Sequence, residues 1–222
     1  MAADSETAGV PAGPGERFAG YGVMGLPFVS GHVLAMRRFP ASSIGPAYTS
    51  VWHRDPHGRW VFWQDQPADQ SCPRYFSNAL SEACLVDIDL SWPSGTTLRV
   101  LIPQVGLVWS AALTSTPATR VLSAVGRAMP DRAWRSAPLL RAMGSVAGFV
   151  MRADRIGMVG RSPNGQEFVA NPSQVWVIDE SSAQLGDDDL GPSGPLREQA
   201  HLGDFWIPQR GVFAVGKAVF QA

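Results

Sequence analysis

The side chains with the greatest chemical potential fall in three short stretches, and the first runs from residue 48 to residue 65. Because successive side chains of a strand point to opposite faces, Tyr48 and Trp52 share one face and His53 lies on the other. Trp63 follows on the returning strand. If the Trp52 face points inward, it lines an aromatic interior suited to a flat apolar ligand, and His53 is a candidate proton donor or acceptor. The alternative is an ordinary apolar core with His53 in solvent.

The second stretch is a strand with one acidic and one apolar face. Asp87 and Asp89 alternate with Val86, Ile88 and Leu90. Such a strand ordinarily turns its acids to water. The alternative is a carboxyl group inside the fold, where burial would raise its pKa and make it a general acid.

The third stretch, residues 201–211, precedes the last predicted strand and is the best single candidate for a site. It brings together His201, Asp204, Trp206 and Arg210 between glycines. Loops and irregular segments at the rim of a barrel often position functional groups. The competing interpretation is a structural plug that closes the barrel.

Motifs that would identify common activities are missing from the sequence. There is no phosphate-binding glycine loop, no dinucleotide fingerprint, no His-Glu-x-x-His, no Cys-x-x-Cys and no Gly-x-Ser-x-Gly. Four scattered histidines give no metal-ligand spacing, so we predict neither a metal nor a cofactor. Lys217 is the single lysine of the chain, which restricts any Schiff-base chemistry to that position.

Short strands separated by turn signals must position these groups. Asp55-Pro56-His57-Gly58 and Ser162-Pro163-Asn164-Gly165 are hairpin turns, because proline presets φ and glycine supplies a positive φ. The predicted strands are residues 32–39, 48–54, 59–64, 85–91, 97–102, 107–113, 155–160, 167–170, 174–178 and 211–220. A sequential antiparallel meander of this length tends to close into a barrel, which removes its edges. We therefore predict a mainly β fold.

One segment, at about residues 118–152, breaks the strand pattern. Its apolar residues recur at helical spacing, and Pro130 and Pro138 should divide it into two or three helices. It is predicted to be a helical insertion in one barrel domain of residues 21–222. Residues 1–20, rich in Ala, Gly, Pro, Ser and Glu, are predicted to form a disordered tail.

Charge is segregated around the predicted helices. Residues 118–155 hold seven arginines against two aspartates, whereas residues 179–204 hold seven acids against one arginine. The simpler interpretation is that the acidic segment lies near the basic helices, in this chain or in the partner subunit of a homodimer. The alternative is a cationic amphipathic face that touches a membrane or an anionic ligand.

The composition excludes several classes of protein. The 222 residues have a net charge of −1 and a pI near 6.4, which argues against a nucleic-acid partner. No apolar run reaches the length of a membrane span, so integral membrane association is not expected. The two cysteines, Cys72 and Cys84, could form one bridge on spacing alone, but without a secretory signal we expect free thiols and a cytoplasmic protein.

The tryptophan-rich hairpins resemble those of a known family. The stretch from Gly45 to Arg54 (GPAYTSVWHR) is similar to strands of the lipocalin-like (calycin) β-barrels, in particular the branch of carotenoid hydratases and small-molecule cyclases. Gly58-Arg59-Trp60 repeats the Gly-x-Trp that lipocalins carry on their first strand, although here it follows a hairpin turn. That branch often has two tandem barrels, and this chain is long enough for one. The resemblance implies an antiparallel meander that closes into a lipocalin-like β-barrel.

These observations favour an enzyme of specialised metabolism. It would bind an apolar, isoprenoid- or polyketide-like molecule in the barrel and promote cofactor-independent cyclisation, hydration or isomerisation. The candidate catalytic residues are Asp204, His53 and His201, and the candidate ligand-binding residues are Tyr48, Trp52, Trp63, Trp109, Trp206 and Arg210.

Two alternatives stay open. A non-catalytic carrier or sensor of a lipophilic molecule would use the same barrel without a titrating group inside. A decarboxylase-like enzyme would form its Schiff base on Lys217, which shares a strand face with Phe213 and Val215. A carboxylate or imidazole with a shifted pKa beside the ligand space would favour an enzyme over a carrier.

Overall fold

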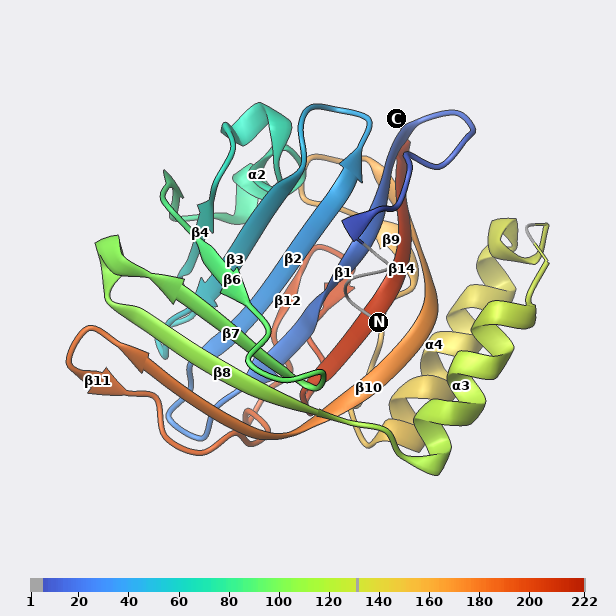
Figure 1. The fold of residues 1–222 in the computed structure, drawn as a ribbon. Coiled ribbons are helices and arrows are strands. Elements are labelled where there is room, and N and C mark those ends of the chain that lie inside the picture. Colours follow the sequence, from blue (N-terminus) through green and yellow to red (C-terminus); the bar gives the residue numbers. More distant parts are fainter. Residues whose placement is uncertain (1–5, 131, 222) are drawn as a thin grey trace.

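One large, curled sheet dominates the fold (Figure 1). The computed structural model describes residues 6–130 and 132–221. The sheet has the strand order β5-β4-β3-β2-β1-β14-β10-β8-β7-β6, with β9 and β11 added to β10, and β12 and β13 form a separate hairpin. The strands are β1 (Glu16–Pro27), β2 (Val33–Ser42), β3 (Tyr48–Arg54), β4 (Trp60–Gln64), β5 (Glu82–Leu85), β6 (Asp89–Ser91), β7 (Thr97–Ile102), β8 (Leu107–Thr114), β9 (Val159–Arg161), β10 (Glu167–Leu185), β11 (Asp188–Asp189), β12 (His201–Leu202), β13 (Phe205–Trp206) and β14 (Val212–Gln221).

The mainly β fold is confirmed, but the sheet forms a half-barrel and not the closed antiparallel barrel that we predicted. The end strands β5 and β6 do not pair with each other, and β5 runs parallel to β4. A parallel neighbour needs a crossover connection. The segment between β4 and β5 supplies it with two short 3₁₀ turns (Ala68–Gln70 and Ser77–Ala79) and the helical turn α2 (Pro73–Phe76), and this crossover interrupts the meander.

The longest strand, β10, joins the two halves of the sheet. It pairs with β14 along residues 167–177 and with β8 along residues 177–185, with a register shift between Pro172 and Gln174. Proline cannot donate to the ladder, so it is placed at an irregularity of this kind. The two strands predicted at 167–170 and 174–178 are therefore one strand with a bulge.

The strand alternation separates two apolar cores. One face of the sheet carries a core that includes Tyr21, Trp109 and Phe213. The other face carries an aromatic core around Trp52 and Phe62, whose rings stack with centroids 4.4 Å apart. A cavity lies on the face of this second core and shares residues with it.

The helical insertion consists of α3 (Pro117–Ala128), a 3₁₀ turn (Ala133–Arg135) and α4 (Ala137–Met151), which stand side by side next to β10 (Figure 1). Thr116 and Thr119 form a capping box at the start of α3, where Pro117 occupies the first turn. Within the described residues, no helix combines the length and the hydropathy that a membrane crossing requires.

The N-terminal strand β1 is not among the strands that we predicted, the first of which begins at residue 32. Residues 16–20, which we assigned to a disordered tail, are the first half of β1, paired with β14 and β2. Glu6, further upstream, accepts a hydrogen bond from the Tyr21 hydroxyl (2.7 Å) and forms an ion pair with Arg38 (3.0 Å). Residues 1–5 lie outside the described part of the chain.

Candidate functional site

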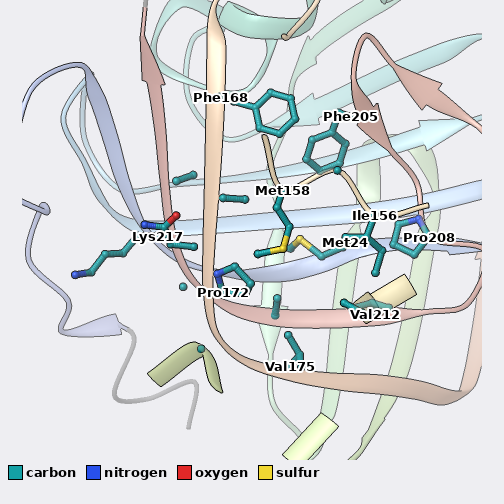
Figure 2. A pocket seen from close by; sticks show the side chains of 18 of the residues that line it. Met24, Ile156, Met158, Phe168, Pro172, Val175, Phe205, Pro208, Val212 and Lys217 are labelled. Carbon is teal, nitrogen blue, oxygen red and sulfur yellow. The ribbon is translucent and has the colours of Figure 1, made fainter. Parts of the chain in front are cut away.

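A cavity of about 530 Å³ lies between the second face of the sheet and the helices α3 and α4. Its walls come from β1, β2, β3, β10 and β14, from both helices, and from the segments 156–158 and 205–208. Figure 2 shows Met24, Met158 and Phe205 at its centre, with Phe168 beside Phe205. This volume lies within the range of about 300–1,000 Å³ that small-molecule sites occupy.

Small residues on the strands make room for the cavity. Gly20, Ala170, Ala214, Gly216 and Ala218 line it, and none has a side chain larger than a methyl group. Larger side chains at the three alanines would fill the space between sheet and helices, whereas a Cβ atom at Gly20 or Gly216 would meet a backbone carbonyl oxygen of the neighbouring strand. Alanines on the neighbouring strands β10 and β14 thus leave the space that the cavity occupies.

Arg37 on β2 is a buried charged group in the wall of this largely apolar space. Its side chain is 5% exposed and donates hydrogen bonds to the carbonyl oxygens of Val23, Met36 (2.8 Å) and Met24 (3.2 Å). A guanidinium group carries five N–H donors, so these three bonds leave donors available to a ligand. No carboxylate among the described residues forms an ion pair with Arg37.

Two aromatic rings hold the guanidinium group in place. Its central carbon lies 4.5 Å from the centroid of Trp52 and 5.1 Å from that of Phe205. Burial lowers the pKa of Arg37 to about 10, so the group stays cationic at neutral pH. A buried charge without a counter-ion is costly unless other groups stabilise it, and here carbonyl oxygens and aromatic faces do so.

Tyr48 and Cys72 lie near Arg37 and complete a polar end of the cavity. The Tyr48 hydroxyl and the Cys72 sulfur are 3.7 Å apart. Burial raises the pKa of both groups, most strongly that of Tyr48, so both are neutral at physiological pH. The polar end therefore combines one fixed positive charge with a neutral hydroxyl and a neutral thiol.

Two further polar atoms near the cavity lack partners. Asn171 Oδ1 and Trp206 Nε1 are buried, belong to residues that line the cavity, and accept or donate no hydrogen bond within the described chain. Buried polar atoms of native proteins are almost always paired.

Three of the predicted ligand-binding residues, Tyr48, Trp52 and Trp206, line the cavity. Trp63 and Trp109 belong instead to the core on the opposite face of the sheet. There the Trp109 indole N–H donates to the Ser181 hydroxyl at 3.1 Å.

His53, a predicted catalytic residue, also lies on the opposite face. Its Nε2 is 2.9 Å from His32 Nδ1, and its ring stacks on Trp63. Burial, together with the neighbouring His32, lowers the pKa of His53 to about 4. His53 is therefore a neutral, buried structural histidine at physiological pH, remote from the cavity face.

The remaining predicted residues lie at the surface. Asp204 is exposed and accepts a hydrogen bond from the Arg161 backbone N–H (2.9 Å), and His201 is exposed and stacks on Trp206. Arg210 pairs with Asp179 at 2.6 Å. None of Asp204, His201 and Arg210 lines the cavity. Asp87 and Asp89 are exposed as well, in line with the solvent interpretation of that strand.

Lys217 borders the cavity, but its amine does not enter it. The residues of β14 that face the cavity are Val212, Ala214 and Ala218, and Lys217 lies on the alternate face with an exposed side chain. In Figure 2 this side chain extends away from the labelled residues of the cavity.

Sequence reasoning missed Arg37, although a signal was present. The residues Val33, Ala35, Arg37 and Phe39 share one strand face, so adjacent Arg37 and Arg38 point to opposite sides of β2. If both faces of this strand are covered, one arginine must be buried. The prediction that the sheet closes on itself could have led to that inference.

The described residues include no group of three or more His, Cys, Asp or Glu side chains placed to hold a metal ion. Cys72 and Cys84 are both free thiols, as predicted.

No family model and no curated protein matches the sequence. Among solved structures, the chain is similar to an acetoacetate decarboxylase from Legionella pneumophila subsp. pneumophila str. Philadelphia 1, with 12% identity and a TM-score of 0.42. The match covers 95% of this chain and 86% of that one. A likeness at this level says nothing of activity.

Proposed function

We propose that this protein binds one lipophilic molecule that carries a single anionic group, and that Arg37 pairs with the anion. The observation that carries the proposal is a buried guanidinium group, without a carboxylate partner in the described chain, at the polar end of an apolar cavity. A ligand carboxylate would supply the missing counter-charge and accept the donors that the backbone leaves free. The apolar body of the ligand would lie along Met24, Met158 and Phe168.

The same geometry argues against chemistry through a carbocation. Such a reaction needs an aromatic face free to stabilise positive charge, yet Trp52 is 1% exposed and is covered by Phe62 and by the Arg37 guanidinium. The permanent positive charge of Arg37 beside the substrate would also destabilise a carbocation, because like charges repel. Cyclisation or hydration by protonation of an apolar chain is therefore not the function that we favour.

A binding protein without catalysis fits the cavity best. A carboxylate or an imidazole beside the ligand space would favour an enzyme. None of the described residues that line the cavity has either group. We accordingly favour the carrier or sensor over the enzyme. We keep the cytoplasm as the proposed location, and the two free thiols support it.

A second candidate function is isomerisation of a carbonyl compound. It is favoured by the Tyr48 hydroxyl and the Cys72 thiol, which lie close together in the wall that also holds Arg37. In that case Arg37 would stabilise an enolate oxygen, but Tyr48 and Cys72 are both protonated at physiological pH and cannot take the α-proton, so this function ranks below the carrier. A Schiff base on Lys217 receives no such support, because its side chain is directed out of the cavity.

The test is the binding of a long-chain fatty acid and of its methyl ester, measured by calorimetry. We expect the purified protein to bind the acid about tenfold to a hundredfold more tightly than the ester, because a charge-assisted bond contributes roughly 1.5–3 kcal/mol. Arg37→Leu should abolish this difference, whereas Arg99→Gln, which changes an exposed arginine on β7, should preserve it.

Folding of the variants is checked by circular dichroism. If Arg37→Leu does not fold, Arg37→Lys is used in its place. This variant keeps the charge but loses the planar donor pair, so it should retain part of the preference for the acid over the ester. Equal affinities of the wild-type protein for acid and ester would overturn the role of Arg37. Absence of binding of either compound would overturn the proposed cavity ligand.

A further inference from the structure

Helix α3 buries its small polar side and exposes its apolar side. Thr119, Ser123 and Gly126 face the sheet, where the Ser123 hydroxyl bonds to the backbone of Val175. Val121 is 63% exposed and Val125, one turn further, is 47% exposed. This is the reverse of the arrangement expected for a helix on the surface of a protein surrounded by water.

Helix α4 also exposes apolar side chains, although its buried side holds Leu140 and Met151 as well as two glycines. Gly144 and Gly148 pack against the backbone of residues 154–156, so closely that neither position has room for a Cβ atom. Val146 is exposed, and Phe149 is 86% exposed. A fully exposed phenylalanine next to exposed valines marks a surface that contacts something apolar.

The two exposed helix faces meet at the mouth of the cavity. Val121 and Val125 of α3, and Leu139 and Val146 of α4, line the cavity and are at the same time exposed. The space between the helices is therefore an apolar opening from the cavity to the outside. Phe149 does not line the cavity and is exposed.

Arginines are frequent in the segment that forms this opening. Residues 117–153 hold six arginines, at positions 120, 127, 132, 135, 141 and 152, with Asp131 as their single acid. All six are exposed, and none forms an ion pair within the described residues. The β10–β11 hairpin, which is the tip of the acidic segment, lies at the far side of the molecule from α3 and α4 (Figure 1), whereas Asp154 and Asp179 line a surface pocket together with Arg152.

We propose that the α3–α4 face docks on an anionic phospholipid membrane, with the cavity mouth toward the lipid. The arginines would contact the phosphate headgroups, while Phe149 and the exposed valines would enter the boundary with the acyl chains. A cationic flank beside an apolar stripe is the arrangement that binds helices in the plane of a membrane interface. Docking would let a poorly soluble molecule pass between the bilayer and the cavity without crossing water.

A second copy of the chain is a poorer occupant of this face. A two-fold dimer brings the same patch of each subunit together, so the arginines of one copy would meet those of the other. Like charges brought together in this way oppose association. The net charge of the face matches an anionic surface and not another copy of itself.

The test is cosedimentation of the full chain with vesicles of phosphatidylcholine alone, or of phosphatidylcholine mixed with phosphatidylglycerol. We expect binding to the mixed vesicles that weakens as salt rises. Arg120→Gln with Arg127→Gln should weaken binding by about fivefold for each arginine removed. Phe149→Ser should weaken it by about tenfold. All three positions are exposed, so the fold should be preserved.

Matched controls change the same residue types elsewhere. Arg99→Gln on β7 and Leu85→Ser, at a residue of β5 that is 65% exposed, should leave vesicle binding unchanged. Failure to bind the mixed vesicles, or equal losses in the control variants, would overturn the proposal. So would a stable dimer in solution that Phe149→Ser dissociates, because the face would then be covered by a second copy. The vesicles carry no cavity ligand, so this result is independent of the fatty-acid test.

Discussion

The guanidinium carbon of Arg37 lies 4.5 Å from the centroid of the Trp52 ring, in the wall of an apolar cavity. This contact explains how a charged residue can be buried without a carboxylate beside it. The aromatic face and three backbone carbonyl groups stabilise the charge, while donors stay available. Trp52 is thus part of the proposed binding site through its contact with Arg37.

Trp52→Ala should lower the free energy of unfolding by about 3–5 kcal/mol, because it removes a large buried ring from a packed aromatic core. Trp52→Phe keeps a ring next to Phe62 and Arg37 and should cost clearly less. Urea denaturation of the two variants measures both values. Equal losses would show that the indole is held by contacts other than ring stacking.

The stability of the protein should fall as the pH drops from about 6.5 to 4, because of His53. Its pKa is about 4 in the folded protein, below the value of an exposed histidine. In this window the unfolded chain takes up a proton that the folded chain does not, so protonation favours unfolding. The stability contributed by neutral His53 is complete above the unfolded pKa, and about 3 kcal/mol of it is lost by pH 4.

The measurement is urea denaturation at several pH values for the wild-type protein and for His53→Gln. The variant has no imidazole at this position, so its stability should depend less on pH across the same window. His57→Gln changes an exposed turn residue and is the control. If His53→Gln kept the full pH dependence, another group would have to account for it.

Local signals predicted most of the strands. The strand at 48–54 was predicted with its observed bounds, as was the strand at 97–102, because turn residues with defined backbone geometry flank them. The open half-barrel could not be predicted from such signals. It depends on the parallel return of β5 beside β4, a long-range pairing that no local pattern encodes.

The site was less accessible to sequence reasoning. Alternation correctly set Tyr48 and Trp52 on one strand face, but which face lines a cavity depends on what covers the sheet. The stretch at 201–211 carries suggestive residue types, yet Asp204 and His201 point to solvent. Composition identifies groups that could react; only the packing of α3 and α4 determines which of them share an enclosed space.

Ser123→Ala should loosen helix α3 from the sheet. The Ser123 hydroxyl accepts a hydrogen bond from the Val175 N–H at 3.0 Å and also reaches the Val175 carbonyl. Its removal leaves these buried backbone groups unpaired, which costs about 1–3 kcal/mol. We expect lower stability and faster hydrogen exchange at the Val175 amide. Ser145→Ala, at an exposed position of α4, should change neither quantity.

Gly148→Ala tests whether the fold requires the close packing of α4 against the backbone of residues 154–156. In a helix, alanine is intrinsically favoured over glycine by about 1 kcal/mol, so propensity alone predicts a gain in stability. The structure predicts the opposite, because a Cβ atom at this position would lie 1.8 Å from the carbonyl oxygen of Asp154. The backbone cannot yield without moving α4 away from residues 154–156.

We therefore expect Gly148→Ala to lower the free energy of unfolding by about 1–3 kcal/mol, the cost of overpacking. Thermal denaturation followed by circular dichroism measures the change. Gly95→Ala is the control: a Cβ atom there meets nothing within 4 Å, so its effect should be near zero or slightly stabilising. A stabilised Gly148→Ala variant would mean that α4 packs less closely than described, and its exposed valines could then turn inward to fill the cavity.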